Sequence, residues 1–176
     1  MRSRPPLRVT AQHRQVHRTV LIVGEGEAEV LFLKHLRQAY LGDRSGGLRF
    51  TTKNAKGKGG KHVLDYTVRQ RRVAAYDAVG SLLDTDTAWT EAEKRAARAA
   101  KITVFESSPC FEALLLQIAG LHAAANSALC KQQFERVFGH QAHDERVYSL
   151  HFSRQVLDGA RATVHTLDTL LKFLGC

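Results

Sequence analysis

The stretch from Val79 to Asp86 constrains the fold more than any other, because it joins an apolar strand to two acidic residues. Its first five residues predict a buried strand, and Asp84 and Asp86 stand at the end of that strand. Strand side chains alternate between two faces, so both carboxylates are expected on one face, with Cα atoms about 7 Å apart. Two like charges about 4 Å apart repel by roughly 4 kcal/mol at an effective dielectric constant near 20. The pair therefore indicates either a hard divalent cation or a strand end with a helix cap at Asp86 or Thr87, and this stretch alone allows both.

The excess of basic residues narrows the choice of partners. The chain has 26 Lys and Arg against 17 Asp and Glu in 176 residues, which gives a formal net charge of +9. A positive charge of this size favours a polyanion, either nucleic acid or an anionic membrane surface, although a role in solubility alone has the same signature. The length suits one domain with its own core.

The cysteines and the uncharged stretches indicate the cellular compartment in which the protein is expected. Cys110, Cys130 and Cys176 are an odd number without CxxC spacing, so they predict neither a zinc site nor a disulfide framework and fit a reducing cytoplasm. The longest uncharged stretch, residues 113–130, contains several polar residues and is better interpreted as a buried helix with a less apolar turn than as a membrane span. We expect a cytoplasmic protein without a secretory signal or membrane segment, in which Cys110 and Cys130 are buried hydrophobic side chains.

Residues 1–18 predict a flexible basic arm, since they carry five arginines, two prolines and no acidic residue. Such an arm either grips phosphates without reading sequence or is a solvated tail, and its composition fits both. The folded domain is expected over residues 19–176, with a core at 19–120 and a helical C-terminal part at 121–176.

A further acidic residue stands at the end of another predicted strand. Residues Thr19–Val23 form a β-branched run typical of a strand covered on both faces, and Gly24-Glu25-Gly26 follows directly. A helical pattern begins at Ala28, so Glu25 is expected at the carboxyl edge of the sheet, where open α/β sheets bind ligands. Glu29 in the first helical turn can face the same way, although acidic residues there also suit the helix dipole.

Basic residues gather between the second predicted strand, residues 48–52, and the helix predicted at 63–76. The connecting residues 53–62 contain four lysines and three glycines. Glycines let a backbone approach a phosphate and lysines supply positive charge, but a mobile solvated loop has the same composition. The residues expected to bind a polyanionic substrate are Lys53, Lys56, Lys58, Lys61, Arg69 and Arg72.

Strands and helices alternate along the rest of the core, with a helix predicted over 88–100 and a strand over 101–105. This alternation predicts an α/β fold with a mainly parallel sheet and helices on both faces. Because parallel strands end at the same edge, Glu25, Asp84 and Asp86 are expected to converge on one crevice. Their convergence favours the metal interpretation of the aspartate pair.

The element after residue 105 completes a recognisable series. Ser108 and Pro109 predict a helix start with Pro109 at or near its first position, which puts Glu112 in the first turn. Four pieces in this order resemble the RloB-like family, whose nuclease core is a variant of the TOPRIM fold related to the OLD-type nucleases. The pieces are Glu25-Gly26 with Glu29, the glycine–lysine loop, Asp84-Thr85-Asp86, and Ser108 to Glu112 with Leu114–Leu116.

The resemblance covers roughly residues 19–120. Ala28 stands where the family tends to have threonine, Ser108 stands where asparagine is common, and the chain from residue 121 matches poorly. The family likeness implies a TOPRIM-like core, whereas the helical C-terminal segment is expected from its own residue pattern.

The resemblance implies a Mg²⁺-dependent nuclease, with Mn²⁺ as a second suitable ion, that cleaves DNA or RNA in bacterial defence against foreign genetic elements. Glu25, Asp84 and Asp86 would hold the metal, and Glu29 and Glu112 would complete a second metal position. The alternative is a non-catalytic nucleic-acid-binding or regulatory subunit that keeps the fold and docks on an ATPase partner, since the chain has no Walker motif.

The C-terminal part contributes two further expectations. His140 and His143 with Asp144 match no standard metal spacing, so they are expected to be solvated or to lie at the edge of the core. Residues 153–174 predict one amphipathic helix that packs on the sheet or against a partner chain, and the second arrangement allows a homo-oligomer.

Overall fold

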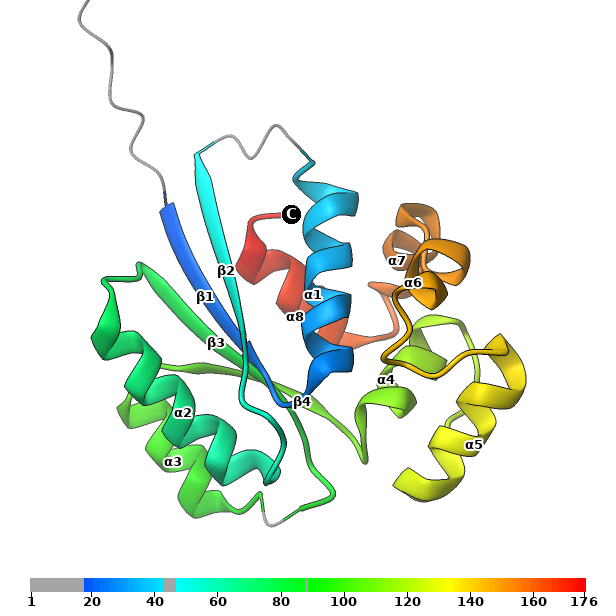
Figure 1. Ribbon diagram of the computed structural model, residues 1–176, viewed down its shortest axis with the longest axis horizontal. Helices are drawn as coiled ribbons and strands as arrows, with labels where there is room; N and C mark the ends of the chain where they lie inside the picture. The colour runs from blue at the N-terminus through cyan, green and yellow to red at the C-terminus, as the bar shows by residue number, and fades with distance from the viewer. Residues whose placement is uncertain (1–17, 43–46, 88) are drawn as a thin grey trace, which may run out of the picture.

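The computed structural model describes residues 18–42, 47–87 and 89–176, and these form four strands and eight helices (Figure 1). The predicted basic arm, except for Arg18, lies outside the described residues. The elements in chain order are β1 (Arg18–Gly24), α1 (Glu27–Tyr40), β2 (Leu48–Asn54), α2 (Gly59–Val73), β3 (Ala78–Asp84), α3 (Glu91–Ala99), β4 (Thr103–Ser107), α4 (Phe111–Ile118), α5 (Ser127–Phe138), α6 (Glu145–His151), α7 (Arg154–Ala160) and α8 (His165–Leu174).

The four strands form one parallel sheet in the order β2-β1-β3-β4. Gly24 at the end of β1 is in register with Leu82 of β3, and Asp84 at the end of β3 is in register with Ser107 of β4. The predicted α/β class is therefore confirmed, with a parallel sheet consistent with a Rossmann- or TOPRIM-like arrangement. Because all strands run the same way, the segments that follow them meet at one edge.

Helices cover both faces of the sheet, as predicted (Figure 1). Alternate residues of β1 serve two cores: Val20 and Ile22 pack with α1 and α4–α8, whereas Leu21 and Val23 pack with α2 and α3. We call these sides the α1 face and the α2 face. A strand buried on both faces needs apolar residues at every position, which explains the continuous run in β1.

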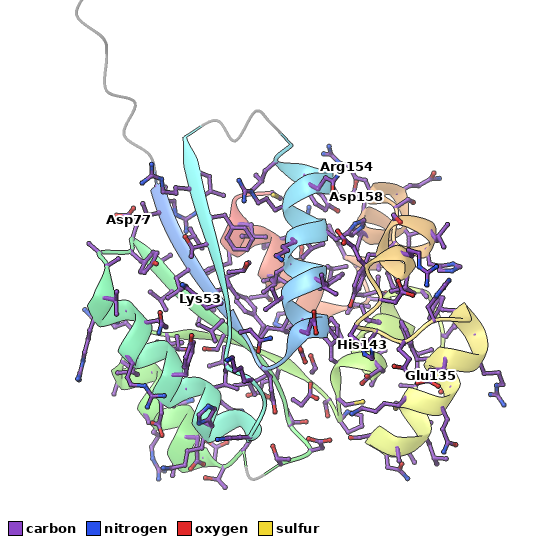
Figure 2. The ribbon with its side chains drawn as sticks, in the orientation of Figure 1. Lys53, Asp77, Glu135, His143, Arg154 and Asp158 are labelled. Carbon is purple, nitrogen blue, oxygen red and sulfur yellow. The ribbon has the colours of Figure 1, made fainter. Side chains whose placement is uncertain are left out.

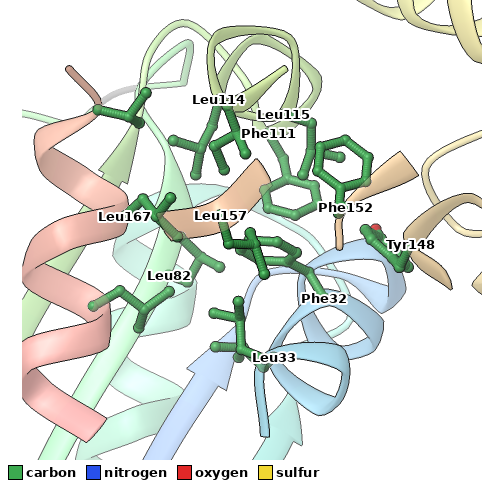
Figure 3. Close-up of a cluster of buried hydrophobic side chains, with 14 of the residues drawn as sticks. Phe32, Leu33, Leu82, Phe111, Leu114, Leu115, Tyr148, Phe152, Leu157 and Leu167 are labelled. Carbon is green, nitrogen blue, oxygen red and sulfur yellow. The ribbon is translucent and has the colours of Figure 1, made fainter. Parts of the chain in front are cut away.

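The α1 face carries the larger core, in which aromatic side chains join distant segments (Figure 3). Phe32 of α1 lies against Phe111 of α4, with ring centroids 5.6 Å apart, and against Tyr148 of α6 at 5.8 Å. Phe152 adds a further ring beside Tyr148. These contacts hold the C-terminal helices against the first turns of α1 and α4.

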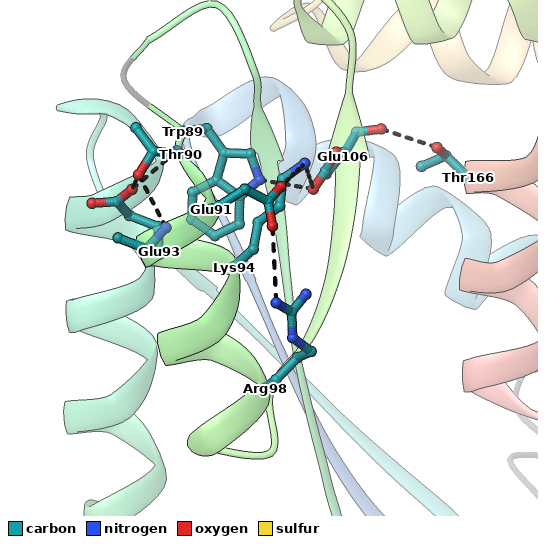
Figure 4. Close-up of polar contacts among 9 residues, drawn as sticks. Trp89, Thr90, Glu91, Glu93, Lys94, Arg98, Glu106 and Thr166 are labelled. Atoms are coloured by element: carbon teal, nitrogen blue, oxygen red, sulfur yellow. Dashed lines mark hydrogen bonds and ion pairs between the residues drawn. The ribbon is translucent and has the colours of Figure 1, made fainter.

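The α2 face is closed by polar groups that bond to one another. The Trp89 indole N–H donates to Glu106 of β4 at 2.8 Å, and Lys94 of α3 pairs with the same carboxylate at 3.5 Å (Figure 4). Helix α3 begins after Thr90, whose side chain forms a capping box with Glu93. The expected start at residue 88 is therefore three residues too early, since the cap selects the boundary.

Two other predicted boundaries are wrong for reasons of packing. Helix α2 begins at Gly59 and not at Val63, because the two glycines expected in the loop start the helix. A Cβ on Gly60 would lie 2.8 Å from Trp89, so only glycine allows this approach. Strand β3 ends at Asp84 and not at Asp86, because its pairing with β4 ends where Asp84 meets Ser107, the last residue of that strand.

The helix starts in the second half of the chain also differ from expectation. Cys110, and not Pro109 or a serine, is the N-cap of α4, and the helix begins at Phe111. The single helix predicted over 153–174 is two helices, because the amides of Thr163 and Val164 both donate to the carbonyl of Ala160 and interrupt the helical path. No helix within residues 18–42, 47–87 and 89–176 has the length and apolar character needed to cross a membrane.

Candidate functional site

A cavity of about 420 Å³ opens at the carboxyl edge of the sheet, beside the first turn of α1. Four of the five predicted acidic residues line it, and they come from the β1–α1 turn, the end of β3 and the start of α4. The complete lining is Glu25, Gly26, Glu27, Ala28, Glu29, Asp84, Phe111, Glu112, Lys131 and His143. The structure thus brings together Glu25, Glu29, Asp84 and Glu112, which are up to 87 residues apart in the sequence (112 − 25).

Glu25 ties together three segments at this edge. Its Oε1 accepts a hydrogen bond from the backbone N–H of Gly59 at 3.1 Å, and its Oε2 accepts one from the N–H of Asp84 at 3.1 Å. Its own carbonyl accepts the N–H of Gly57 at 2.8 Å. The end of β1, the end of β3 and the start of α2 are therefore fixed relative to one another by a single residue.

Glu29 is only 5 % exposed and lies in the first turn of α1. Its Oε2 accepts the N–H of Gly26 at 2.9 Å, and a Cβ on Gly24 would lie 2.8 Å from the Glu29 Cβ. Gly24 is thus required for close approach of the helix. Burial, with smaller contributions from the Glu25 and Glu112 charges, raises the pKa of Glu29 to about 7.

Asp84 is the most perturbed acid of the cavity. Burial, followed by the charges of Glu29 and Glu25, raises the pKa of Asp84 to about 9. Its Oδ1 is buried and has no hydrogen-bond partner within the part of the chain that the structure describes. A buried oxygen left unpaired costs about 1–3 kcal/mol, and more for a charged group. This oxygen therefore favours a cationic occupant of the cavity.

Glu112 also lines the cavity, and Tyr148 supports the backbone of the lining residue Ala28. Glu112 lies in the first turn of α4, where the predicted helix start was expected to put it. The Tyr148 hydroxyl lies within hydrogen-bond distance of the carbonyl oxygens of Ala28, at 2.9 Å, and of Ala142. Cys110 precedes this turn, and burial raises the pKa of its thiol to about 12, so it is an inert core side chain as predicted.

Asp86 lies outside the cavity wall. It is exposed, and its Oδ2 accepts a short hydrogen bond from the hydroxyl of Ser127, the first residue of α5. Its charge still contributes to the raised pKa of Asp84. The expectation that Asp84 and Asp86 share one strand face is wrong, because regular strand structure stops at Asp84.

None of the six residues expected to bind substrate lines this cavity. Lys53 near the end of β2 (Figure 2) and Lys56 and Lys58 in the connection to α2 lie near the same edge, and their side chains are exposed. Lys61 pairs with the exposed Asp65 of α2 at 3.8 Å.

Arg69 and Arg72 lie farther from the acids. They belong to the second half of α2, which begins at the carboxyl edge, so Arg69 is about 15 Å from Gly59 along the helix axis. The Arg69 guanidinium lies over the ring of Tyr66, 5.8 Å from its centroid. The structure therefore does not bring these two arginines to the acidic cavity.

Sequence reasoning missed Lys131 of α5 and assigned no role to His143. Both line the cavity together with the acids, and both come from the part of the chain that the family resemblance does not cover. His143 lies in the connection between α5 and α6 (Figure 2). The neighbouring His140, which was expected to be solvated or at the edge of the core, lies 3.0 Å from Asp144 through its Nδ1.

The donor set of the cavity suits a hard divalent cation, because it consists of carboxylate oxygens and includes the unpaired Oδ1 of Asp84. Glu25 and Asp84 are the residues best placed to hold such an ion, with Glu29 and Glu112 beside them. Among residues 18–42, 47–87 and 89–176, no three Asp, Glu, His or Cys side chains are already gathered closely enough to enclose one.

No protein-family model matches this chain, and neither a curated protein nor a solved structure matches it significantly. The resemblance to the RloB-like family therefore stays a prediction that rests on the four sequence pieces.

Proposed function

We propose that the protein is a divalent-metal-dependent nuclease that hydrolyses phosphodiester bonds in DNA or RNA at the cavity of Glu25, Glu29, Asp84 and Glu112. The observation that carries this proposal is the buried, unpaired Oδ1 of Asp84 among three other carboxylates. The acids gathered in this cavity favour a bound cation there. The net charge of +9 favours a polyanion around the cavity.

The chemistry follows from the residues of the cavity. A bound Mg²⁺ or Mn²⁺ supplies charge neutralisation at the phosphate and a water molecule of lowered pKa. Glu25 and Asp84 would hold the ion, and Glu112 would hold it or a second one. Glu29, with its pKa near 7, would accept the proton of the attacking water as the new P–O bond forms. The ester P–O bond breaks on the opposite side of the phosphorus, and the leaving oxygen would take a proton from solvent water.

The biological part of the proposal rests on the family resemblance alone. A role in bacterial defence, a cytoplasmic location and an ATPase partner belong to that expectation. The fold and the acidic cavity are compatible with them, and the experiment below addresses the chemistry first.

Isothermal titration of Mn²⁺ and Mg²⁺ into the metal-free protein tests the site. We expect saturable binding that weakens by about 100-fold or more in Asp84→Asn, since even the loss of a residue behind a ligand costs about 10–100-fold. Asp65→Asn is the matched control, because it removes the same charge from the exposed face of α2, and it should bind as the wild type does. Cleavage of labelled DNA and RNA should depend on the metal and on Asp84 alike.

Absence of metal binding by the wild type, with and without an oligonucleotide, would contradict the nuclease proposal. The non-catalytic nucleic-acid-binding or regulatory subunit would then become the leading hypothesis. Equal metal affinity in the wild type and Asp84→Asn would place the ion elsewhere in the chain.

A further inference from the structure

The acidic cavity has a second wall, which is built by the C-terminal part of the chain. Lys131 and His143 line the cavity together with the acids, and they are the two lining residues that can carry a positive charge. An adjoining cavity of about 250 Å³ is also lined by Lys131 and His143, together with Glu112. The two residues thus stand at the junction of two hollows, one of which contains the acids.

Neither residue of this wall is paired with an acid of the cavity in the described part of the chain. The Lys131 ammonium has no carboxylate oxygen within 4.0 Å there, whereas Lys94 has two carboxylate partners and Lys172 has one. His143 likewise makes no hydrogen bond among the described residues, although the neighbouring His140 bonds to Asp144. Both side chains are exposed and can reach a bound molecule.

The backbone behind each side chain is held in place. The Ser127 hydroxyl donates to Asp86, which follows β3, and Lys131 lies one helical turn beyond Ser127 on the same side of α5. The Asn126 side chain caps this helix by accepting the N–H of Leu129 at 3.0 Å. His143 follows Ala142, whose carbonyl accepts the buried Tyr148 hydroxyl. Asp86 is a positioning residue in this arrangement, because it fixes the helix that carries Lys131.

We propose that Lys131 and His143 bind the scissile phosphate of the nucleic acid, Lys131 through its ammonium and His143 through a ring N–H. The four carboxylates repel an approaching phosphodiester. A cation bound among them turns this repulsion into attraction, but only on the side of the phosphate that faces the cation. The two residues supply positive charge and a donor on the other side. This inference deepens the proposed nuclease function, and it assigns the phosphate contact to the C-terminal part and not to the glycine–lysine loop.

Oligonucleotide binding tests this inference without any need for cleavage. The probe is a fluorescein-labelled 12-nucleotide single strand, as DNA and as RNA, measured by anisotropy with Ca²⁺ in place of Mg²⁺. Lys131→Ala should weaken binding about 10-fold and lower the slope of log Kd against log salt by about 1, as expected for one lost phosphate contact. Lys131→Arg should retain most of the affinity, and His143→Ala should cost about 3-fold, in line with one lost hydrogen bond.

Arg136→Ala is the matched control, because Arg136 is exposed on the same helix and lines neither cavity. It removes the same charge and should change the affinity less than 2-fold at physiological salt, since a charge outside the contact surface is largely screened. Equal losses in Lys131→Ala and Arg136→Ala would overturn the proposal, and so would an unchanged affinity in Lys131→Ala or a wild type that binds neither oligonucleotide.

Metal titration separates this proposal from the nuclease proposal. Lys131→Ala should bind Mn²⁺ as tightly as the wild type, because the ion is held by the acids. If the wild type binds no metal and Lys131→Ala still weakens oligonucleotide binding more than Arg136→Ala does, the nuclease proposal fails. The proposal that Lys131 and His143 bind phosphate then stands. If the wild type binds metal and Lys131→Ala binds the oligonucleotide as Arg136→Ala does, the proposal for Lys131 and His143 fails and the nuclease proposal stands.

Discussion

The two faces of the sheet each bury a serine, and the surroundings of these serines differ. Ser81 of β3 lies on the α2 face, where its hydroxyl is 2.8 Å from that of Thr67, which in turn donates to the carbonyl of Val63. Ser107 of β4 follows Phe105 by two residues and so lies on the α1 face, next to Asp84 in register. Both are fully buried, yet the Ser107 hydroxyl has no partner among the described residues.

Under the nuclease proposal, this difference distinguishes a structural face of the sheet from a functional one. Buried polar groups in folded proteins are normally hydrogen-bonded, so each exception calls for an explanation. The α2 face satisfies the buried hydroxyls of Ser81 and Thr67 within the chain. Among the described residues, the α1 face leaves Asp84 Oδ1 and Ser107 Oγ, which belong to residues in register at the strand ends, without partners. Under the nuclease proposal, these two oxygens mark the place where the fold gives up stability for a ligand.

Removing the Asp84 charge should have the largest effect on the stability of the metal-free protein. The folded-state pKa of Asp84, about 9, lies above its ordinary value of 3.8, so the folded protein binds one more proton between these limits. The free energy of unfolding therefore falls as pH rises from about 4 to about 9, and Glu29 adds to the loss up to about pH 7. Asp84→Asn should raise Tm at pH 8 in EDTA by about 4–8 °C, which corresponds to about 2 kcal/mol.

Thermal unfolding at pH 5 and pH 8, with and without Mn²⁺, checks this expectation. The gain should shrink at pH 5, because the proton that the folded Asp84 carboxyl takes up costs less free energy at a pH closer to its ordinary pKa of 3.8. Mn²⁺ should stabilise the wild type but not Asp84→Asn. Asp65→Asn on the α2 face should leave the pH dependence unchanged. A variant that is less stable than the wild type at pH 8 would show that Asp84 is a satisfied structural residue.

Truncation of the two serines should have opposite outcomes. Ser81→Ala removes the hydrogen bond to Thr67 and should cost about 1 kcal/mol, or about 2–4 °C in Tm. Ser107→Ala removes a hydroxyl without a partner, so Tm in EDTA should stay the same or rise by about 1–2 °C. Calorimetry of both variants in EDTA measures the difference. Equal losses would remove the distinction between the two faces.

Much of the fold could be predicted because it depends on local patterns. The β-branched run of β1, the helical spacing of α1 and the alternation of the two element types were sufficient for a parallel sheet with helices on both faces. Boundaries were missed where a distant residue decides them, as at Gly60, which must be a glycine because Trp89 packs on it. No local sequence pattern predicts such a contact.

The candidate site likewise has residues that could be predicted from the sequence and residues that could not. Glu25, Glu29, Asp84 and Glu112 could be predicted to converge, since parallel strands end at one edge and each acid follows a strand. Lys131 and His143 could not, because their place depends on how α5 and its following connection fold over that edge. The spacing of Ser127 and Lys131 by four residues is a weak signal, and it acquires meaning only from the contact of Ser127 with Asp86.

The smallest effect is expected for the basic end of α2, on the structural face. Arg69 and Arg72 are exposed, and Arg69 contacts only the ring of Tyr66 among the charged or aromatic partners that the structure describes. The double variant Arg69→Ala/Arg72→Ala should change Tm by no more than about 1–2 °C, in keeping with surface substitutions of within about 0.5 kcal/mol. It should weaken oligonucleotide binding less than about 3-fold at physiological salt, although it removes two charges, because both lie beyond the Debye length of about 8 Å from the acids. A loss as large as that of Lys131→Ala would mean that the nucleic acid runs along α2. The α2 face would then be a binding surface as well, and unsatisfied buried oxygens would no longer be what distinguishes the functional side of the sheet.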